Sequence, residues 1–238
     1  MRSTAQILAA VDAAAGSGRS LPELLCADCT MHLGLVGAGM ALMNDTGHQG
    51  VVGASGALSA RLEELQFELG EGPGLDASRD NTPILRSDLS ARGSTAWPAF
   101  GPAAVAAGVC AVFALPLQVG AVRLGSLCLY RAAPGSLGVE ETATALAYAD
   151  GAVEVLVRLH AQVAPGSVLH PDVGATLRLR AEVHQATGFL SVQASVGITE
   201  ALLLLRAYAF SADRPLLEIA RDVLSGRLRI RLKEDEDG

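Results

Sequence analysis

The sequence predicts an α+β protein: a domain with an antiparallel sheet flanked by helices, followed by an all-helical bundle. Two observations predict this order. Up to His160, short apolar runs with strand character alternate with helical patterns, whereas every periodic stretch after "QVAPGSVLHP" is helical. The two prolines and the glycine of that segment mark the best domain boundary in the chain. We therefore expect a first domain over 1–162, a linker over 163–171, a three-helix domain over 172–233 and an acidic tail over 234–238.

The first domain is expected to contain two pairs of strands between helices. The segments "AGMALMN" and "GVVGAS" are typical of strands joined at a polar turn, and "GVCAVFALPLQVGAVRLGSLCLYR" of a hairpin that turns at Gly120 and Ala121. Between them, "LGEGPGLDASRDNTPILRSDL" is rich in turn residues and predicts a loop with one strand. The other expected bounds are helices over Thr4–Ala15, Leu21–Leu33 and Val139–His160, with the isolated strand near Thr82–Arg86.

The second domain is expected to contain three helices on short connections, which predicts a small bundle. Pro171 suits the first turn of a helix that runs to about Ala194. Thr199 is suited to cap the helix "EALLLLRAYAF", and Pro215 opens "LLEIARDVLSGRLRI".

The first of these three helices has a glycine on its exposed side. Its apolar residues, spaced by four, three and four positions, are Leu179, Val183, Ala186 and Leu190. At about 100° per residue they lie within a narrow sector, and Gly188 falls almost opposite them. An exposed glycine lowers the stability of a helix by about 1 kcal/mol relative to alanine, so a glycine at this position needs an explanation. Either Gly188 clears space for a ligand, or it is the left-handed residue that ends the helix.

The charges divide unevenly along the chain. Residues 1–165 contain 15 acidic and 9 basic side chains, residues 166–233 contain 9 basic and 6 acidic ones, and the last five residues add four acids. A basic second domain behind an acidic first one is a weak indication of nucleic-acid binding. No apolar run is long enough to span a membrane and the first residues lack a secretory pattern, so we expect a cytoplasmic protein with reduced thiols.

The second domain also carries a specific arrangement of small and apolar residues. The segment "HQATGFLSVQASVGITEALLLLRAYAFSADRPLLEIARDVLSGRLR" resembles an ANTAR domain, a three-helix RNA-binding module of bacterial transcription antiterminators. The resemblance covers about Asp172 to Ile230. The residues that match are Ala186, Gly188, Ala201, Leu205, Arg206, Ala209, Ala220 and Val223.

Most of residues 20–160 resembles a GAF sensory domain of the kind that precedes ANTAR modules in actinobacteria. The segments that carry this resemblance are "LGEGPGLDA", "WPAFGPAA", "FALPLQVGAVRLGSLCLYR" and "PGSL". The pairing implies a GAF sensor, with an unidentified small-molecule or protein signal, that controls an ANTAR module.

The resemblance implies a regulator that binds paired hairpins of nascent RNA at their short loops and keeps a terminator from forming. The residues agree in part, because small side chains on a helix let a phosphate or an unstacked loop base approach while polar and basic neighbours contact it. The RNA-binding residues expected on this basis are Arg180, His184, Gln185, Thr187, Gly188, Arg206, Tyr208, Ala209 and Arg214.

Several features leave the extent of this interface open. Many ANTAR modules have lysine where this chain has Thr187, so a phosphate contact there is weakened or is supplied by Arg180 or Arg178. Tyr208 either stacks on a base or packs into the core. Three arginines near the end either contact RNA or form a solvated helix end: Arg227, Arg229 and Arg231.

The sequence indicates no catalytic, metal or cofactor site. Cys26, Cys29 and His32 are spaced like metal ligands, but a fourth ligand is not evident and buried thiols are the preferred interpretation. Cys110 and Cys128 are expected to pack within strands. The segment "GEGPG" lacks the lysine of a phosphate-binding loop.

Two helices indicate a homodimer. Leu202, Leu203, Leu204 and Leu205 occupy consecutive positions, and a helix that is apolar all round needs cover on all sides. The long helix that ends at about His160 offers another seam, through Ala143, Leu146, Ala147, Val153 and Val157.

Two other classes of function remain open. A DNA-binding regulator with a GAF sensor would need a recognition helix rich in exposed polar and basic residues, whereas "EALLLLRAYAF" is apolar. A GAF-type redox enzyme is the other, because this fold includes free methionine sulfoxide reductases, which need accessible cysteines. RNA binding without catalysis is the preferred interpretation.

Overall fold

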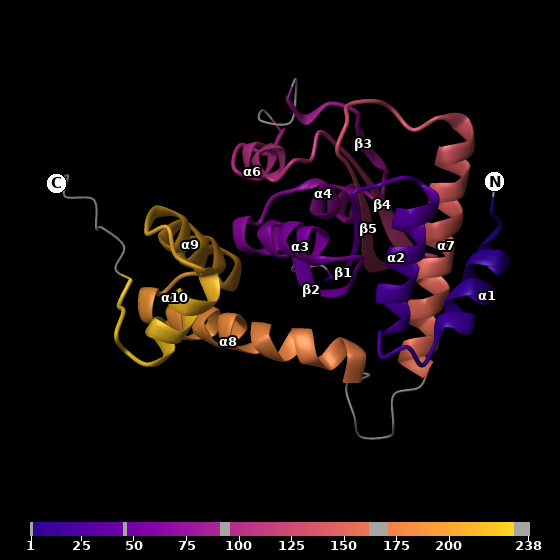
Figure 1. The fold of residues 1–238 in the computed structure, drawn as a ribbon. Coiled ribbons are helices and arrows are strands. Elements are labelled where there is room, and N and C mark those ends of the chain that lie inside the picture. The colour runs from indigo at the N-terminus through magenta and orange to yellow at the C-terminus, as the bar shows by residue number, and fades with distance from the viewer. Residues whose placement is uncertain (1, 45–46, 91–95, 162–170, 231–238) are drawn as a thin grey trace. The chain divides into compact units, whose positions relative to one another are not determined.

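A computed structural model describes residues 2–44, 47–90, 96–161 and 171–230, and Figure 1 shows its course. Side chains are described for the same ranges except 44, 47–48 and 171–180. Contacts between residues divide the chain into two compact units, Met1–Gly174 and Ala175–Gly238. The expected linker, apart from Pro171, and the expected acidic tail lie outside the described residues.

The first unit is built on a five-stranded antiparallel sheet in the order β2-β1-β5-β4-β3. Its strands are β1 (Gly37–Asn44), β2 (Gly47–Ala54), β3 (Ile84–Arg86), β4 (Ala111–Val119) and β5 (Val122–Arg131). Gly120, with a φ of 58°, forms the expected turn between β4 and β5. The left-handed backbone conformation there favours glycine.

Helices cover both faces of this sheet (Figure 1). They are α1 (Thr4–Ala14), α2 (Leu21–His32), α3 (Ala57–Leu69), α4 (Pro73–Asp80), α6 (Phe100–Ala106) and α7 (Val139–Ala161). Helices α2 and α7 pack on one face with α1 against them, whereas α3 and α4 pack on the other face with α6 beside α3. Burial on both faces explains why the central strands are continuous apolar runs instead of alternating patterns.

Helices α3 and α4 are the main departure from the sequence expectation. Neither helix is among the elements expected from the sequence, and α4 falls within "LGEGPGLDASRDNTPILRSDL", which predicts a loop with one strand. The buried side of α3 consists of Ser59, Leu62, Glu63, Gln66 and Phe67, so three of its five residues are polar and the apolar periodicity is hidden. Helix α4 buries proline and glycine in its first turn, which are residues that otherwise indicate a turn.

The described part of the second unit consists of α8 (Pro171–Ala194), which begins four residues before the unit boundary, α9 (Ile198–Ser211) and α10 (Leu216–Leu224). Small residues alternate with large ones in its core, which allows the helices to approach closely. The buried residues are Val183, Ala186, Thr187, Leu190, Ala201, Leu205, Ala209, Leu216, Ile219, Ala220, Val223 and Ile230.

The ends of these helices differ in detail from the expectation. Ser195, with a φ of 56°, is the left-handed residue that follows α8, so the alternative that Gly188 ends this helix is wrong. Gly197 occupies the N-cap position of α9 without a side-chain hydrogen bond, so the expected Thr199 cap is also wrong. Helix α10 stops at Leu224, and Gly226 with a φ of 74° turns the chain away.

Candidate nucleic-acid interface

Helix α8 presents a small-residue surface on the side away from its core. Val183, Ala186 and Leu190 are at most 1% exposed, which confirms the apolar stripe expected for them. A methyl group added at Gly188 would meet no described part of the chain within 4 Å outside the backbone of its own helix. Ala181 is exposed two turns earlier on the same side. This side of α8 is therefore open to close approach.

Polar side chains border that surface, although one expected member is absent. His184 and Gln185 are exposed, and His184 lies one turn before Gly188 on the same side of α8. Thr187 is only 2% exposed, and its hydroxyl donates a 2.7 Å hydrogen bond to the Val183 carbonyl oxygen. Thr187 is therefore turned inward instead of bordering the open surface, with its hydroxyl hydrogen-bonded to the preceding turn, and its expected role in RNA binding stays a prediction.

The basic residues expected near the start of this surface are not described at side-chain level. Arg180 lies within α8, but its side chain and that of Arg178 fall outside the described residues. Their contribution to the interface stays a prediction.

Helix α9 separates the two residues that were expected to act together on it. Arg206 is half-buried and Tyr208 is 36% exposed, so Tyr208 is not a core residue. Positions two apart on an α-helix differ by about 200°, so these side chains leave opposite flanks of the buried seam. Ala209 belongs to that seam at 5% exposure, so little of its surface is open to a ligand and its expected contact with RNA stays a prediction. The expected residues of α9 therefore do not form one continuous patch.

Arg214, between α9 and α10, is held by acidic side chains. Its guanidinium lies 2.9 Å from the Asp222 carboxylate and 3.3 Å from that of Glu218. Arg227 pairs with the same Asp222 at 2.7 Å. Hydrogen bonds from Arg227 and then Arg214 lower the pKa of the Asp222 carboxyl. Exposed pairs of this kind add little stability, but they offset the cationic charge that a phosphate would meet.

The second unit also exposes aromatic rings that the sequence pattern did not single out. The first unit buries all of its aromatic side chains to 2% or less: Phe67, Trp97, Phe100, Phe113, Tyr130 and Tyr148. The second unit exposes all three of its own, with Phe189 at 51%, Tyr208 at 36% and Phe210 at 68%. Helical spacing could have predicted this exposure. Phe189 and Phe210 each follow or precede a buried residue in sequence but do not occupy a position of the buried stripe.

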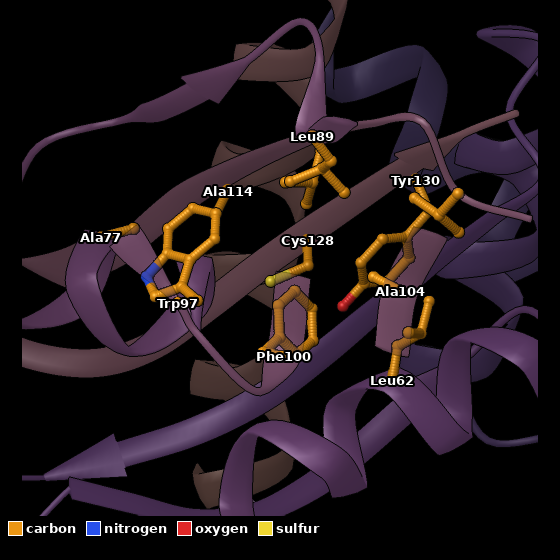
Figure 2. Packing of buried hydrophobic residues seen from close by; sticks show 11 residues of the cluster. Leu62, Ala77, Leu89, Trp97, Phe100, Ala104, Ala114, Cys128 and Tyr130 are labelled. Atoms are coloured by element: carbon orange, nitrogen blue, oxygen red, sulfur yellow. The ribbon is translucent and has the colours of Figure 1, made fainter. Parts of the chain in front are cut away.

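In the first unit, one face of the sheet meets a dense apolar cluster, shown in Figure 2. The rings of Trp97, Phe100 and Tyr130 gather around Cys128, and Trp97 packs edge-on against Phe100 with ring centroids 6.1 Å apart. Helix α6 carries Phe100 into the cluster, and Glu71 fixes its start by accepting 2.7 Å hydrogen bonds from the Ala99 and Phe100 amides. Side chains therefore fill the space between α6 and the sheet.

A buried polar network lies beside this cluster. The Tyr130 hydroxyl donates a 2.7 Å hydrogen bond to Glu63, and the Gln66 amide donates to the same carboxyl at 3.2 Å. Gln66 in turn accepts a 2.8 Å hydrogen bond from the Gly74 amide, which ties α3 to α4. Burial is the first cause of the raised pKa of Tyr130. The network holds α3 and α4 against β5.

Three of the four cysteines are inaccessible. Cys26, Cys29 and Cys128 have no exposed surface, which confirms the interpretation as buried thiols, and burial raises the pKa of each. Cys110 is only partly buried. No cluster of three or more histidine, cysteine or acidic side chains suited to a metal ion occurs among the residues whose side chains are described.

Comparison with solved structures gives the first unit its fold. The GAF domain of a phosphoenolpyruvate-protein phosphotransferase from Coxiella burnetii matches 67% of this chain and 95% of its own length, with 14% identity and a TM-score of 0.51. The first unit has the GAF fold. The GAF domain of the Acinetobacter phosphoenolpyruvate-protein phosphotransferase matches 68% of this chain and 94% of its own length, with 9% identity and a TM-score of 0.50. At such identities the likeness extends to the GAF fold alone.

The sheet and its flanking helices confirm the α+β class expected for the GAF unit. No protein-family model matches the chain, and no curated protein sequence matches it. Within the described parts of the chain, no single helix combines the length and apolar composition needed to cross a bilayer.

Proposed function

We propose that this protein is an RNA-binding regulator of transcription in which the second unit acts as an ANTAR domain under the control of the GAF unit. The observation that carries the proposal is the open surface at Gly188, in the middle of a continuous helix. A glycine there lowers helix stability by about 1 kcal/mol relative to alanine without relieving any contact in the described fold. A ligand that approaches the backbone of α8 supplies the missing reason.

RNA loops fit this surface by their chemistry. The sequence of a hairpin is accessible at its unpaired loop bases, which polar side chains read at their edges. His184 and Gln185 supply such groups beside Gly188, and Arg206 supplies a cation for the phosphates. Bound at two hairpins of a nascent transcript, the protein would keep a terminator from forming. The role is binding and not catalysis.

DNA recognition fits the second unit less well. The exposed side of α9 carries Leu203 at 64% and Phe210 at 68% exposure. A helix that reads base edges in the major groove needs polar and basic side chains at such positions. We therefore place RNA ahead of DNA.

The proposal includes a cytoplasmic homodimer that pairs through α7. Val139, Leu146 and Val157 are 89%, 46% and 45% exposed, and they lie on one stripe with spacings of seven and eleven residues. Ala143 and Val153 complete the stripe at partly buried positions. A second copy of the same face would cover these side chains, as in isologous dimers, and would give the particle two RNA-binding surfaces.

The test is binding of the full-length protein to a labelled pool of RNAs, each with two short stem-loops of randomised loop sequence. We expect the wild-type protein to enrich particular loops and Arg206→Ala to lose that enrichment while its circular dichroism spectrum is unchanged. Arg61→Ala removes an arginine that is 59% exposed on the GAF unit and should bind as the wild type does. Equal binding by Arg206→Ala and wild type would remove Arg206 from the interface, and no enrichment by the wild type would overturn the proposal.

A further inference from the structure

We propose that Phe210 is a stacking platform for an unpaired base of the bound RNA loop; this assignment rests on the proposed RNA binding. Its ring is 68% exposed in the last turn of α9, the most exposed aromatic side chain of the described protein. Every aromatic residue of the GAF unit is buried, whereas the second unit leaves Phe189, Tyr208 and Phe210 exposed. An exposed ring offers a flat apolar face of the kind on which bases stack.

The neighbours of Phe210 suit a nucleotide. Arg206 precedes it by four positions, so the two side chains are adjacent on the surface of α9. Arg214 lies beyond the end of α9, where helical spacing no longer places it beside Phe210. A ring beside a cation lets the base stack while its phosphate contacts the guanidinium, a combination common in single-strand recognition. Acidic side chains already pair with Arg214, so we assign the phosphate contact to Arg206, which is next to Phe210 on the helix surface.

The arrangement of side chains around Phe210 disfavours a second copy of the chain as the partner that covers this ring. Leu203, Arg206 and Phe210 follow one another at spacings of three and four on the outer side of α9. In a two-fold symmetric contact through this stripe, the two copies of Arg206 would face each other near the axis. Like charges opposed in an interface weaken it, whereas a polyanion is attracted to the same arginine.

The experiment compares substitutions of Phe210 in the full-length protein bound to the selected stem-loop RNA, with 2-aminopurine placed at successive loop positions. Phe210→Ala and Phe210→Leu should each weaken binding by about 5- to 150-fold, the usual effect of losing one stacked base. Phe210→Trp should retain binding. Leu203→Ala, at a neighbouring position that is 64% exposed, should bind as the wild type does. One loop position should show 2-aminopurine quenching with wild type and none with Phe210→Leu.

The possible results separate the two proposals. Retained affinity and quenching in Phe210→Leu would overturn the stacking assignment, because leucine keeps the apolar surface without the ring. Equal losses in Leu203→Ala and Phe210→Ala would also overturn it and indicate a general apolar contact. A fall in mass by light scattering for Phe210→Ala would assign this face to a protein partner. A wild-type protein that binds no stem-loop would instead overturn the proposed function itself.

Discussion

The Tyr130 hydroxyl donates a 2.7 Å hydrogen bond to the Glu63 carboxyl, and this contact joins strand β5 to helix α3 inside the GAF unit. Both residues are fully buried, as is Gln66, which donates to the same carboxyl. Buried polar groups are costly unless their hydrogen bonds are made, so the network fixes one arrangement of α3 over the sheet.

Tyr130→Phe should therefore destabilise the GAF unit by about 1–3 kcal/mol, because Glu63 stays buried with one donor fewer. Urea unfolding followed by fluorescence measures this unit directly, since Trp97 is the single tryptophan and lies in its core. Tyr208→Phe is the matched control in the second unit and should leave the unfolding midpoint unchanged. An unchanged midpoint for Tyr130→Phe would contradict the role given to the network.

The stability of the GAF unit should fall as the pH rises above about 9. Burial raises the pKa of Tyr130 and of Cys128 above their ordinary values of 10.0 and 9.0. A raised pKa in the folded state means that the protonated form is favoured, so this stability is fully present below the ordinary values and is lost as the pH climbs through the raised ones. The Trp97 unfolding midpoint at pH 7, 9 and 10.5 measures the loss. An unfolding midpoint that stays constant or rises with pH would contradict the expected loss of stability.

Thiol reagents should modify at most one cysteine rapidly in the native protein. Cys26, Cys29 and Cys128 are fully buried with raised pKa values, so their reactive thiolate forms are suppressed. Maleimide labelling at pH 7.5 followed by mass spectrometry should add a single group, at Cys110, and Cys110→Ser should abolish it. Two or more rapidly labelled thiols would revive the alternative of a redox enzyme.

Gly188→Ala should separate stability from RNA binding. The added methyl group meets no described side chain, so α8 should gain up to about 1 kcal/mol, seen as slower amide hydrogen exchange. RNA affinity should fall, because the methyl group fills the space that the ligand approaches. Gln193→Ala, at an exposed position on α8, should not weaken binding. A variant that is stabilised and binds normally would leave Gly188 without the proposed role.

Leu146→Glu should shift the protein from dimer to monomer. Leu146 is 46% exposed, so a glutamate is tolerated in the free chain but buries a charge in the proposed α7 seam. Light scattering coupled to size exclusion at micromolar concentration gives the mass. Val105→Glu, 37% exposed on α6, should remain a dimer. A monomeric wild type would contradict the seam.

Local pattern alone determined the elements whose buried residues are apolar and regularly spaced. The β4–β5 hairpin, with its glycine turn, was expected at nearly its observed position, and so were α7 and α8. The stripe of Val183, Ala186 and Leu190 was correct because periodic burial leaves a periodic sequence.

Only the tertiary structure shows which polar residues are buried and which apolar residues are exposed. Glu63 and Gln66 look like surface residues in sequence, yet they are buried because Tyr130 and each other satisfy them across the fold. Thr187 was expected outside and lies inside, while Phe210 is apolar and lies outside. The chemistry of a side chain determines the free-energy cost of burying it. Whether a hydrogen-bond partner is present to offset that cost depends on segments far apart in the chain.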